Sequence, residues 1–402
     1  MTDRLYYHDS YVTEFRARVV DVNQNDASPD RCNVYLDRTA FYPASGGQPF
    51  DLGKLGGADV IEVVDEDGRI AHVLSGAVSN DEVSGVIDWR RRFDHMQQHS
   101  GQHLLSAVLI DLFDATTVSF HLGSDSSTID IARPLEPNQI RQAERRANEI
   151  VFENRPVSVS FEDSSQDLGL RKATDREGIV RIVTIQDLDR SACGGTHVRG
   201  TAEIGPILIR KLDRIRGTQR LEFVCGLRAV DRARADYESL SAVARAFSSG
   251  LDETPALVAA HIEKLQEAEK ARRRLATELA QAKGRELHAA TAAGPGGLRR
   301  IQQRVPTLSD ELRAEAQSFT AGGKAIFLAL AENPPAVLLA ASKDSGVNAG
   351  EVLKAALTEL GGRGGGNPTM AQGSLADQES LKRFLSSSVI QLFGSSVPSQ
   401  DK

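Results

Sequence analysis

Apolar and polar residues alternate in short runs from the start of the chain to about residue 88. Glycine, aspartate and asparagine separate the runs, of which the clearest are EFRARVVDV, CNVYLDR, DVIEVVDE and RIAHVLSG. Because successive side chains of a strand point to opposite faces, this alternation predicts strands with one buried face. Residues 1–88 are therefore expected to form a small, mostly β domain, whose turns contain TAFYPASGGQPFDLG at residues 39–53.

The pattern becomes helical after Asp88. An aspartate at this position can cap a helix that runs to about Phe113, because its carboxylate accepts hydrogen bonds from the free N–H groups of the first turn. The expected apolar stripe of this helix is Leu104, Leu105, Val108, Leu109 and Leu112. Strands such as SVSF and GIVRIVTI and a helix near residues 136–153 follow, and residues 89–250 are expected to form an α+β domain.

The remaining chain divides into a helix and a second mixed region. From Pro255 to Ala290 the sequence is rich in Ala, Glu, Lys, Arg and Leu, which predicts a long exposed helix, and TAAGPGG is typical of a linker. We assign residues 251–295 to a helical spacer and linker. The tail, residues 296–402, alternates strands (AIFLALA, AVLLAAS) with helices (AGEVLKAALTEL, DQESLKRFLSSS) and predicts a compact α/β domain.

Composition narrows the classes of function. The chain has 402 residues, 40% of them hydrophobic, and a net charge of -7, which predicts a soluble protein that binds polyanions only through local basic patches. Three such patches are Arg90–Arg92, Arg272–Arg274 and Arg299 with Arg300. No apolar run reaches the eighteen or so residues of a membrane span, and the first residues do not resemble a secretion signal, so we expect a cytoplasmic protein.

Two histidines within HMQQHSGQHLL have the spacing of a metal site on a helix. His99 and His103 are four residues apart, so both imidazoles can reach one ion from one helix face. The simpler interpretation is a pair of polar-face residues. His95 extends the same face by one turn, and we expect it to face solvent or to support a ligand without binding the ion.

The segment CGGTH adds a second pair, Cys193 and His197, with two glycines that indicate a tight loop. Two imidazoles from the helix, one thiolate and a third imidazole make a donor set suited to tetrahedral zinc. This combination favours a metal site over a chance pair of histidines. The other two cysteines, Cys32 and Cys225, have no ligand-spaced partners and are expected to be small buried side chains.

Four motifs in order make the sequence resemble the alanyl-tRNA editing family, which comprises the free-standing AlaX proteins and the editing domain of alanyl-tRNA synthetase. The motifs cover nearly the whole chain: FYPASGGQPFDLG, HSGQHLL, the segment from CGGTH to EFVCG at residues 193–226, and GGRGGGNPTMAQGS at residues 361–374. The last resembles the signature of the DHH-associated C-terminal domain of alanyl-tRNA synthetase. Because the first motif lies so close to Met1, with no aminoacylation domain before it, we expect an editor that works in trans.

The resemblance implies a fold and a reaction. The fold class is α+β: an N-terminal β-barrel, a central zinc-containing editing domain, the helical spacer and a C-terminal α/β DHH-associated domain. The reaction is hydrolysis of the ester that joins serine, or glycine, to alanine-specific tRNA, with one zinc ion per chain held by His99, His103, Cys193 and His197. Zinc can activate water, or it can orient the substrate while another group holds the water.

The family also suggests which residues read the substrate. Thr39 and Gln48 are candidates for binding the serine hydroxyl, because a site built to bind a hydroxyl rejects alanine by leaving a polar group unpaired. Gln48 is also the catalytic candidate. In the tail, Arg363, Gly364 and Gly365 are candidates for RNA binding, since the glycines of Gly361–Gly366 expose backbone amides. Asn367 departs from the family, which commonly has a basic residue there.

Other interpretations remain open. The long helix is expected to set the distance between the editing site and the tail, and a homodimer through it is one further expectation, although Leu257, Ile262, Leu265 and Leu275 are too sparse for a strict heptad. The rival functions are an editor of another mischarged tRNA and a zinc-stabilised tRNA-binding module without catalysis. A phosphoesterase is excluded by the lack of an Asp-His-His motif.

Overall fold

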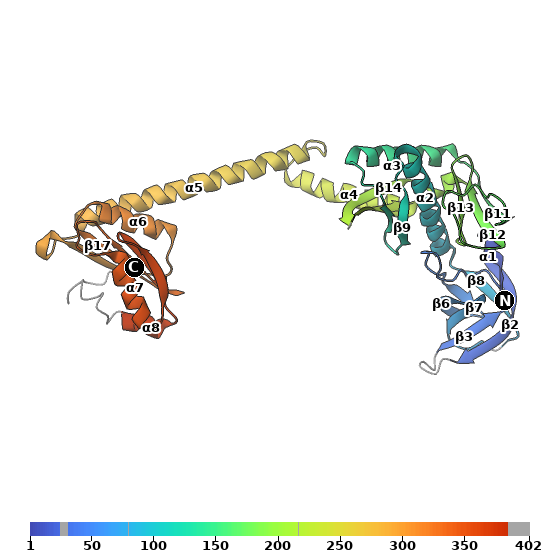
Figure 1. The fold of residues 1–402 in the computed structure, drawn as a ribbon, viewed down its shortest axis with the longest axis horizontal. Coiled ribbons are helices and arrows are strands. Elements are labelled where there is room, and N and C mark those ends of the chain that lie inside the picture. Colours follow the sequence, from blue (N-terminus) through green and yellow to red (C-terminus); the bar gives the residue numbers. More distant parts are fainter. Residues whose placement is uncertain (25–30, 79, 216, 385–402) are drawn as a thin grey trace. The chain divides into compact units, whose positions relative to one another are not determined.

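The computed structural model describes residues 1–24, 31–78, 80–215 and 217–384, and it contains two compact units, residues 1–243 and 244–402. Figure 1 shows the course of the chain. The architecture is α+β, as the sequence predicts. None of the helices in the described ranges is long and apolar enough to cross a membrane.

The first unit begins with a closed six-stranded barrel in the order β2-β3-β7-β6-β5-β8. Its strands are β2 (Glu14–Gln24), β3 (Arg31–Leu36), β5 (Gly53–Leu55), β6 (Ala58–Glu66), β7 (Arg69–Ser75) and β8 (Glu82–Ile87). The four alternating runs of the sequence correspond to β2, β3, β6 and β7. Their inward side chains, including Val34, Val63, Ile70 and Leu74, are buried, so the barrel core follows directly from the alternation.

Outside the barrel, β1 (Asp3–Arg4) pairs in parallel with β4 (Arg38–Thr39), and α1 (Leu5–His8) lies between them in sequence. The loop after β4 contains the glycine-rich motif. Its Asp51 forms a fully buried ion pair with Arg92 of the following helix. The interpretation of Arg90–Arg92 as a basic patch is therefore wrong for Arg92, whose guanidinium also donates to the carbonyls of Ser10 and Ala40.

Helix α2 (Trp89–Phe113) is the central element of the first unit, and the Asp88 carboxylate caps it by accepting from the Arg91 N–H. Every residue from His95 to Leu109 is buried. The predicted apolar stripe is buried from Leu104 to Leu109, whereas Leu112 is 41% exposed. Residues 95–109 of the helix are thus covered on all sides, so their polar side chains must find partners inside the protein.

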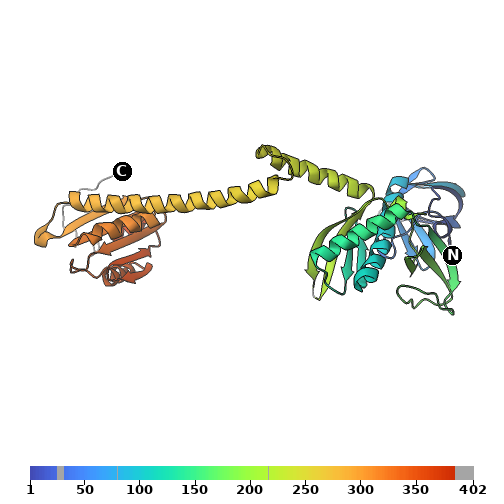
Figure 2. The same ribbon diagram turned by 90° about the horizontal axis from the view of Figure 1, so that it is seen from above.

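Two antiparallel sheets and a helix surround α2. One has the order β14-β15-β10-β9, and the other β11-β12-β13. Their bounds are β9 (Thr117–Leu122), β10 (Ser127–Ile131), β14 (Ile207–Ile215), β15 (Thr218–Cys225), β11 (Val157–Asp163), β12 (Ile179–Ile185) and β13 (Asp189–Ala192). Helix α3 (Pro137–Glu153) coincides with the predicted helix, η1 (Thr201–Ile204) precedes β14, and α4 (Leu227–Ala246) follows β15. Figure 2 shows these elements from above.

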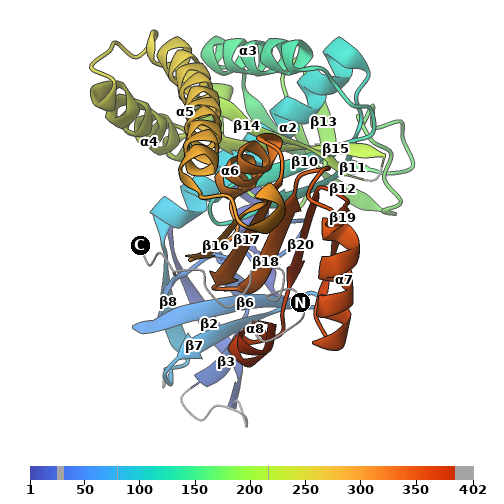
Figure 3. The same cartoon turned by 90° about the vertical axis from the view of Figure 1, so that its left-hand side faces the viewer.

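The second unit is a five-stranded sheet of order β16-β17-β18-β20-β19 with helices on both faces. The strands are β16 (Arg299–Val305), β17 (Ala325–Glu332), β18 (Pro335–Ala341), β19 (Arg363–Asn367) and β20 (Met370–Ser374). Helices α5 (Thr254–Ala290) and α6 (Asp310–Ala321) cover one face, and α7 (Ala349–Glu359) and α8 (Gln378–Phe384) cover the other (Figure 3). The turn η2 (Pro295–Gly297) lies in the predicted linker.

One expectation for this unit needs correction. Helix α5 is not exposed along its whole length, because Ala280 and Gly284 are buried against α6. Within the glycine-rich segment, Arg363–Asn367 forms the exposed edge strand of the sheet. The predicted last helix is present as α8, and its expected residues from 385 onward lie outside the described part of the chain.

Candidate metal centre and adjoining cavity

Four side chains from two segments meet in the first unit. His99 and His103 lie one turn apart on α2, and Cys193 and His197 lie on the loop that follows β13. One donor atom of each lies within 4.8 Å of all the others. The Cys193 Sγ is 3.5 Å from His99 Nε2 and 3.3 Å from His197 Nε2. The donors of tetrahedral zinc lie about 3.5 Å from each other, so this cluster could hold a metal ion.

Each imidazole is fixed through its other nitrogen. The Nδ1 atoms face hydrogen-bonding partners and leave the Nε2 atoms toward the cluster, which is the arrangement that orients histidine ligands in metal sites. The pairs are His99 with Gln48 Oε1 (2.8 Å), His103 with Asp189 Oδ2 (3.0 Å) and His197 with Ser100 Oγ (3.1 Å). The barrel loop, β13 and α2 itself therefore each orient one ring.

The glycines of CGGTH have different roles. At Gly195 an added Cβ would lie 2.2 Å from His99 Cε1, so only glycine lets the loop approach this ring. At Gly194 the nearest atom would be Tyr7 Oη at 3.4 Å, an ordinary contact. Thr196 then joins the loop to the barrel, because its N–H donates to Gln48 Oε1 at 3.1 Å and its hydroxyl accepts from Gln48 Nε2 at 2.8 Å.

The cluster favours a thiolate. Burial alone would raise the pKa of Cys193, but the adjacent His99 and His197 hold it well below its usual range. Burial alone would lower the pKa of His103, but the Asp189 carboxylate and the adjacent Cys193 raise it to about 9. Asp189 keeps a lowered pKa despite its burial, because His103 and Arg171 both stabilise its charge. A partly buried thiolate among imidazoles is the form of cysteine that binds metal.

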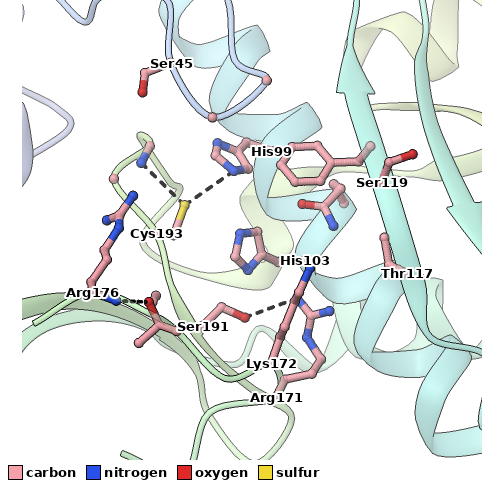
Figure 4. A pocket seen from close by; sticks show the side chains of 18 of the residues that line it. Ser45, His99, His103, Thr117, Ser119, Arg171, Lys172, Arg176, Ser191 and Cys193 are labelled. Carbon is pink, nitrogen blue, oxygen red and sulfur yellow. Dashed lines mark hydrogen bonds between the residues drawn. The ribbon is translucent and has the colours of Figure 1, made fainter. Parts of the chain in front are cut away.

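A cavity of about 520 Å³ opens onto the cluster. Figure 4 shows its lining, with His99, His103 and Cys193 around one part of it. Small residues form the wall beside them: Ser45, Gly46, Gly47, Gly194 and Gly195. Thr117, Ser119 and Phe120 come from β9, and Arg171, Lys172 and Arg176 come from the loop between β11 and β12. The cavity can therefore admit a polar ligand next to the four donors.

The other predicted site residues have separate places. Gln48 is buried behind His99 and is not among the residues that line the cavity. Thr39 is buried too, where its hydroxyl lies 2.8 Å from His72 Nε2 and accepts from the Phe41 N–H. His95 is 2% exposed and does not face solvent. Arg363, Gly364 and Gly365 lie on β19 of the second unit. Cys32 and Cys225 are buried, as expected.

The sequence interpretation missed three residues that organise the centre. Asp189 and Ser100 hold the rings of His103 and His197, and the Arg171 Nε donates to Asp189 Oδ1 at 2.6 Å. Ser100 directly follows a predicted ligand, which is a weak signal. Asp189 and Arg171 give no signal in the sequence. Both lie far along the chain from His103, and they come together with it only when β13 packs beside α2.

Comparisons with known proteins agree with this architecture. Residues 180–222 match the family described as threonyl and alanyl tRNA synthetase second additional domain, and residues 302–394 match the DHHA1 domain. The chain is 33% identical to the alanyl-tRNA editing protein AlaX-L of Pyrococcus horikoshii, over 93% of this chain and 94% of that protein. It is 33% and 34% identical to the alanine–tRNA ligases of Methanoregula boonei and Halobacterium salinarum, and it spans less than half the length of these ligases, 42% and 43%.

Proposed function

Because the chain belongs to the alanyl-tRNA editing protein family of the AlaX-L type, we propose that it is a cytoplasmic hydrolase that removes serine, and glycine, from mischarged alanine-specific tRNA. The bond broken is the ester between the amino acid and the terminal ribose, which yields free amino acid and free tRNA. The observation that carries the proposal is the cluster of His99, His103, Cys193 and His197 at the wall of a cavity.

The metal in this proposal is one zinc ion, because three imidazoles and a thiolate are the ligands that zinc prefers. When bound there, zinc supplies a Lewis acid next to the cavity. The protein's own residues fix the rings: Gln48, Asp189 and Ser100 hold the Nδ1 atoms and so keep each Nε2 lone pair inward. The small residues of the wall let a substrate approach closely.

Selection of serine is proposed for Gln48 and Thr39. Gln48 is the better supported of the two, because its amide touches both His99 and Thr196 and so links the barrel loop to the metal centre. A shift of this side chain would change the position of His99 at the cavity. Thr39 contacts His72 inside the barrel and does not line the cavity, so any effect of Thr39 on substrate selection would be indirect.

The second unit is proposed to recruit the tRNA. Its support is the match to the DHHA1 domain and the exposed edge strand β19, where Arg363 lies next to Gly364 and Gly365. Unpaired N–H groups of an edge strand can donate to phosphate oxygens. Homodimerisation through α5 is a separate proposal, for which the exposed Ile262, Leu265 and Leu275 offer apolar contacts.

The decisive experiment measures the release of labelled amino acid from alanine-specific tRNA that carries serine, glycine or alanine. Wild type should release serine rapidly and spare alanine, and a folded Cys193→Ala variant with a measured zinc content should lose the activity. If no ester is cleaved by a zinc-loaded wild type, the chain is a zinc-stabilised tRNA binder; release only from another mischarged tRNA would make it an editor of that tRNA.

A further inference from the structure

The loop between β11 and β12 gives the cavity a positive wall. It contributes Arg171, Lys172 and Arg176, and the described residues that line the cavity include no aspartate or glutamate; Asp175 and Glu177 of the same loop do not line it. This excess is local, because the whole chain has a net charge of -7. Cations that no carboxylate neutralises favour an anionic ligand when they lie beside a reaction centre.

The three cations are not equivalent. Arg171 is neutralised, since its Nε donates to Asp189 Oδ1 at 2.6 Å and its Nη2 donates to Ser191 Oγ at 3.1 Å. Within the described ranges no carboxylate lies at ion-pair distance from Lys172 or Arg176, and both are exposed. These two side chains are therefore available to a ligand.

The loop is also fixed relative to the metal centre. The Arg171 N–H donates to the Arg190 carbonyl at 2.9 Å, and the Arg190 Nε donates to the Leu168 carbonyl at 3.1 Å. Together with the Arg171–Asp189 pair, these bonds attach the loop to the strand whose Asp189 orients His103. Figure 4 shows Arg176 on the side of Cys193 and Lys172 on the side of His103. Lys172 directly follows the attached Arg171, and Arg176 lies five residues after Arg171 on the same loop, so the two cations flank the centre.

We propose that Lys172 and Arg176 form a phosphate-binding site for the acceptor end of the tRNA, which holds its last phosphodiester groups while the aminoacyl ester lies at the metal centre. This inference rests on the proposed function and assigns the binding of one part of its substrate. The phosphodiester before the terminal nucleoside is only one ribose away from the ester, so a single short cavity can bind both. Cationic side chains are the usual partners of such phosphates.

The test compares two seryl esters. One is an RNA hairpin that reproduces the acceptor stem, with its phosphates; the other is seryl-adenosine, which has none. In Lys172→Gln, Arg176→Gln and the double variant, KM for the hairpin should rise, several-fold for each single change, with kcat and the rate on seryl-adenosine unchanged. The salt dependence of log(kcat/KM) for the hairpin should become shallower by about 0.7 for each cation removed.

The controls separate a phosphate site from a general loss of charge or fold. Arg16→Gln removes an exposed cation from the barrel strand β2 and should leave the kinetic constants for both substrates at their wild-type values. Lys172→Arg, which keeps the charge, should preserve KM for the hairpin. Two results would overturn the proposal. One is an equal loss of hydrolysis rate with both esters, and the other is an unchanged KM for the hairpin in the double variant.

Failure of the proposed function gives a different result. In that case wild type cleaves neither ester, and binding of the uncharged hairpin, measured by fluorescence anisotropy, takes the place of KM. Weaker binding in the double variant than in Arg16→Gln would support the phosphate site without any catalysis. Equal binding in all three proteins would overturn it.

Discussion

At the scale of single residues, the centre depends on side chains that hold the ligands in place. An imidazole can bind metal through Nε2 only when its Nδ1 carries the proton, and this tautomer is favoured by an acceptor at Nδ1. Asp189 provides the strongest such acceptor, because it is a buried carboxylate that contacts His103 Nδ1 at 3.0 Å. Its replacement should therefore affect metal binding before it affects the fold.

Asp189→Asn should weaken zinc affinity about 10- to 100-fold, the usual effect of losing a partner of a metal-bound histidine. The measurement is competition for zinc with a chromophoric chelator at pH 7. Asp187→Asn, the same chemical change at an exposed position two residues earlier, should leave the affinity at the wild-type value. Equal affinities for all three proteins would show that Asp189 does not support a metal ligand.

Gly195→Ala should reduce both bound zinc and hydrolysis, because the new methyl group would overlap the His99 ring at 2.2 Å. Gly194→Ala is the matched control, with a nearest contact of 3.4 Å. Zinc content by mass spectrometry and the rate of serine release decide the matter. Full zinc occupancy in Gly195→Ala would mean that the loop can move away without cost.

Thr39→Val tests whether this residue selects the substrate or stabilises the barrel. The change leaves His72 Nε2 and the Phe41 N–H without their partner, which should lower the free energy of unfolding by about 1–3 kcal/mol. Urea unfolding measures this loss. A lower ratio of serine to alanine release would add a role in selection, and an unchanged ratio in a destabilised variant would leave Thr39 with a structural role alone.

At the scale of elements, burial changes what a sequence pattern means. Gln97 and Gln98 look like the polar face of a surface helix, yet both are buried in α2: Gln97 donates to the Glu203 carbonyl, and Gln98 exchanges hydrogen bonds with the backbone of Cys225. The same helix passes close to β15, where a Cβ on Gly101 would lie 2.3 Å from Cys225 Sγ. These contacts join α2 to the sheet and hold its two histidines in place.

Close packing against neighbouring side chains also explains some of the glycines in the tail. In the hairpin of β19 and β20, a Cβ on Gly373 would lie 2.2 Å from Leu357 Cδ1 of α7, whereas a Cβ on Gly365 would have no atom of the described residues within 4 Å. Gly373→Ala should therefore lower the unfolding temperature, and Gly365→Ala should not; calorimetry tests both. If Gly365→Ala nevertheless weakened tRNA binding, the effect would belong to RNA contact and not to stability.

At the scale of the whole molecule, we expect the first unit to carry out the hydrolysis and the second unit to bind the tRNA. Removal of the chain from about residue 296 onward should mainly raise KM for mischarged tRNA and leave kcat nearly unchanged, because the four donors and the cavity lie within residues 1–243. Steady-state hydrolysis by the truncated and full chains measures both constants. Unchanged tRNA affinity after truncation would remove the recruitment role.

The sequence by itself determined the α+β class, four of the six barrel strands, the bounds of α2, α3 and α5, and the family. Strand alternation, a helix cap and closely spaced motifs each depend on residues that are near one another in the chain, so they can be recognised from the sequence. It also identified the four donors, because their residue types and spacing are unusual in combination.

Only the tertiary structure decided what surrounds those donors. Asp189, with its partner Arg171, meets His103 because β13 packs beside α2. Gln48 reaches His99 from the glycine-rich loop of the N-terminal barrel. Likewise, Arg92 is an inner ion-pair partner and not a surface cation, because Asp51 lies opposite it in the folded chain. Such pairings join residues that are far apart in sequence, and their contacts leave no periodic signal along it.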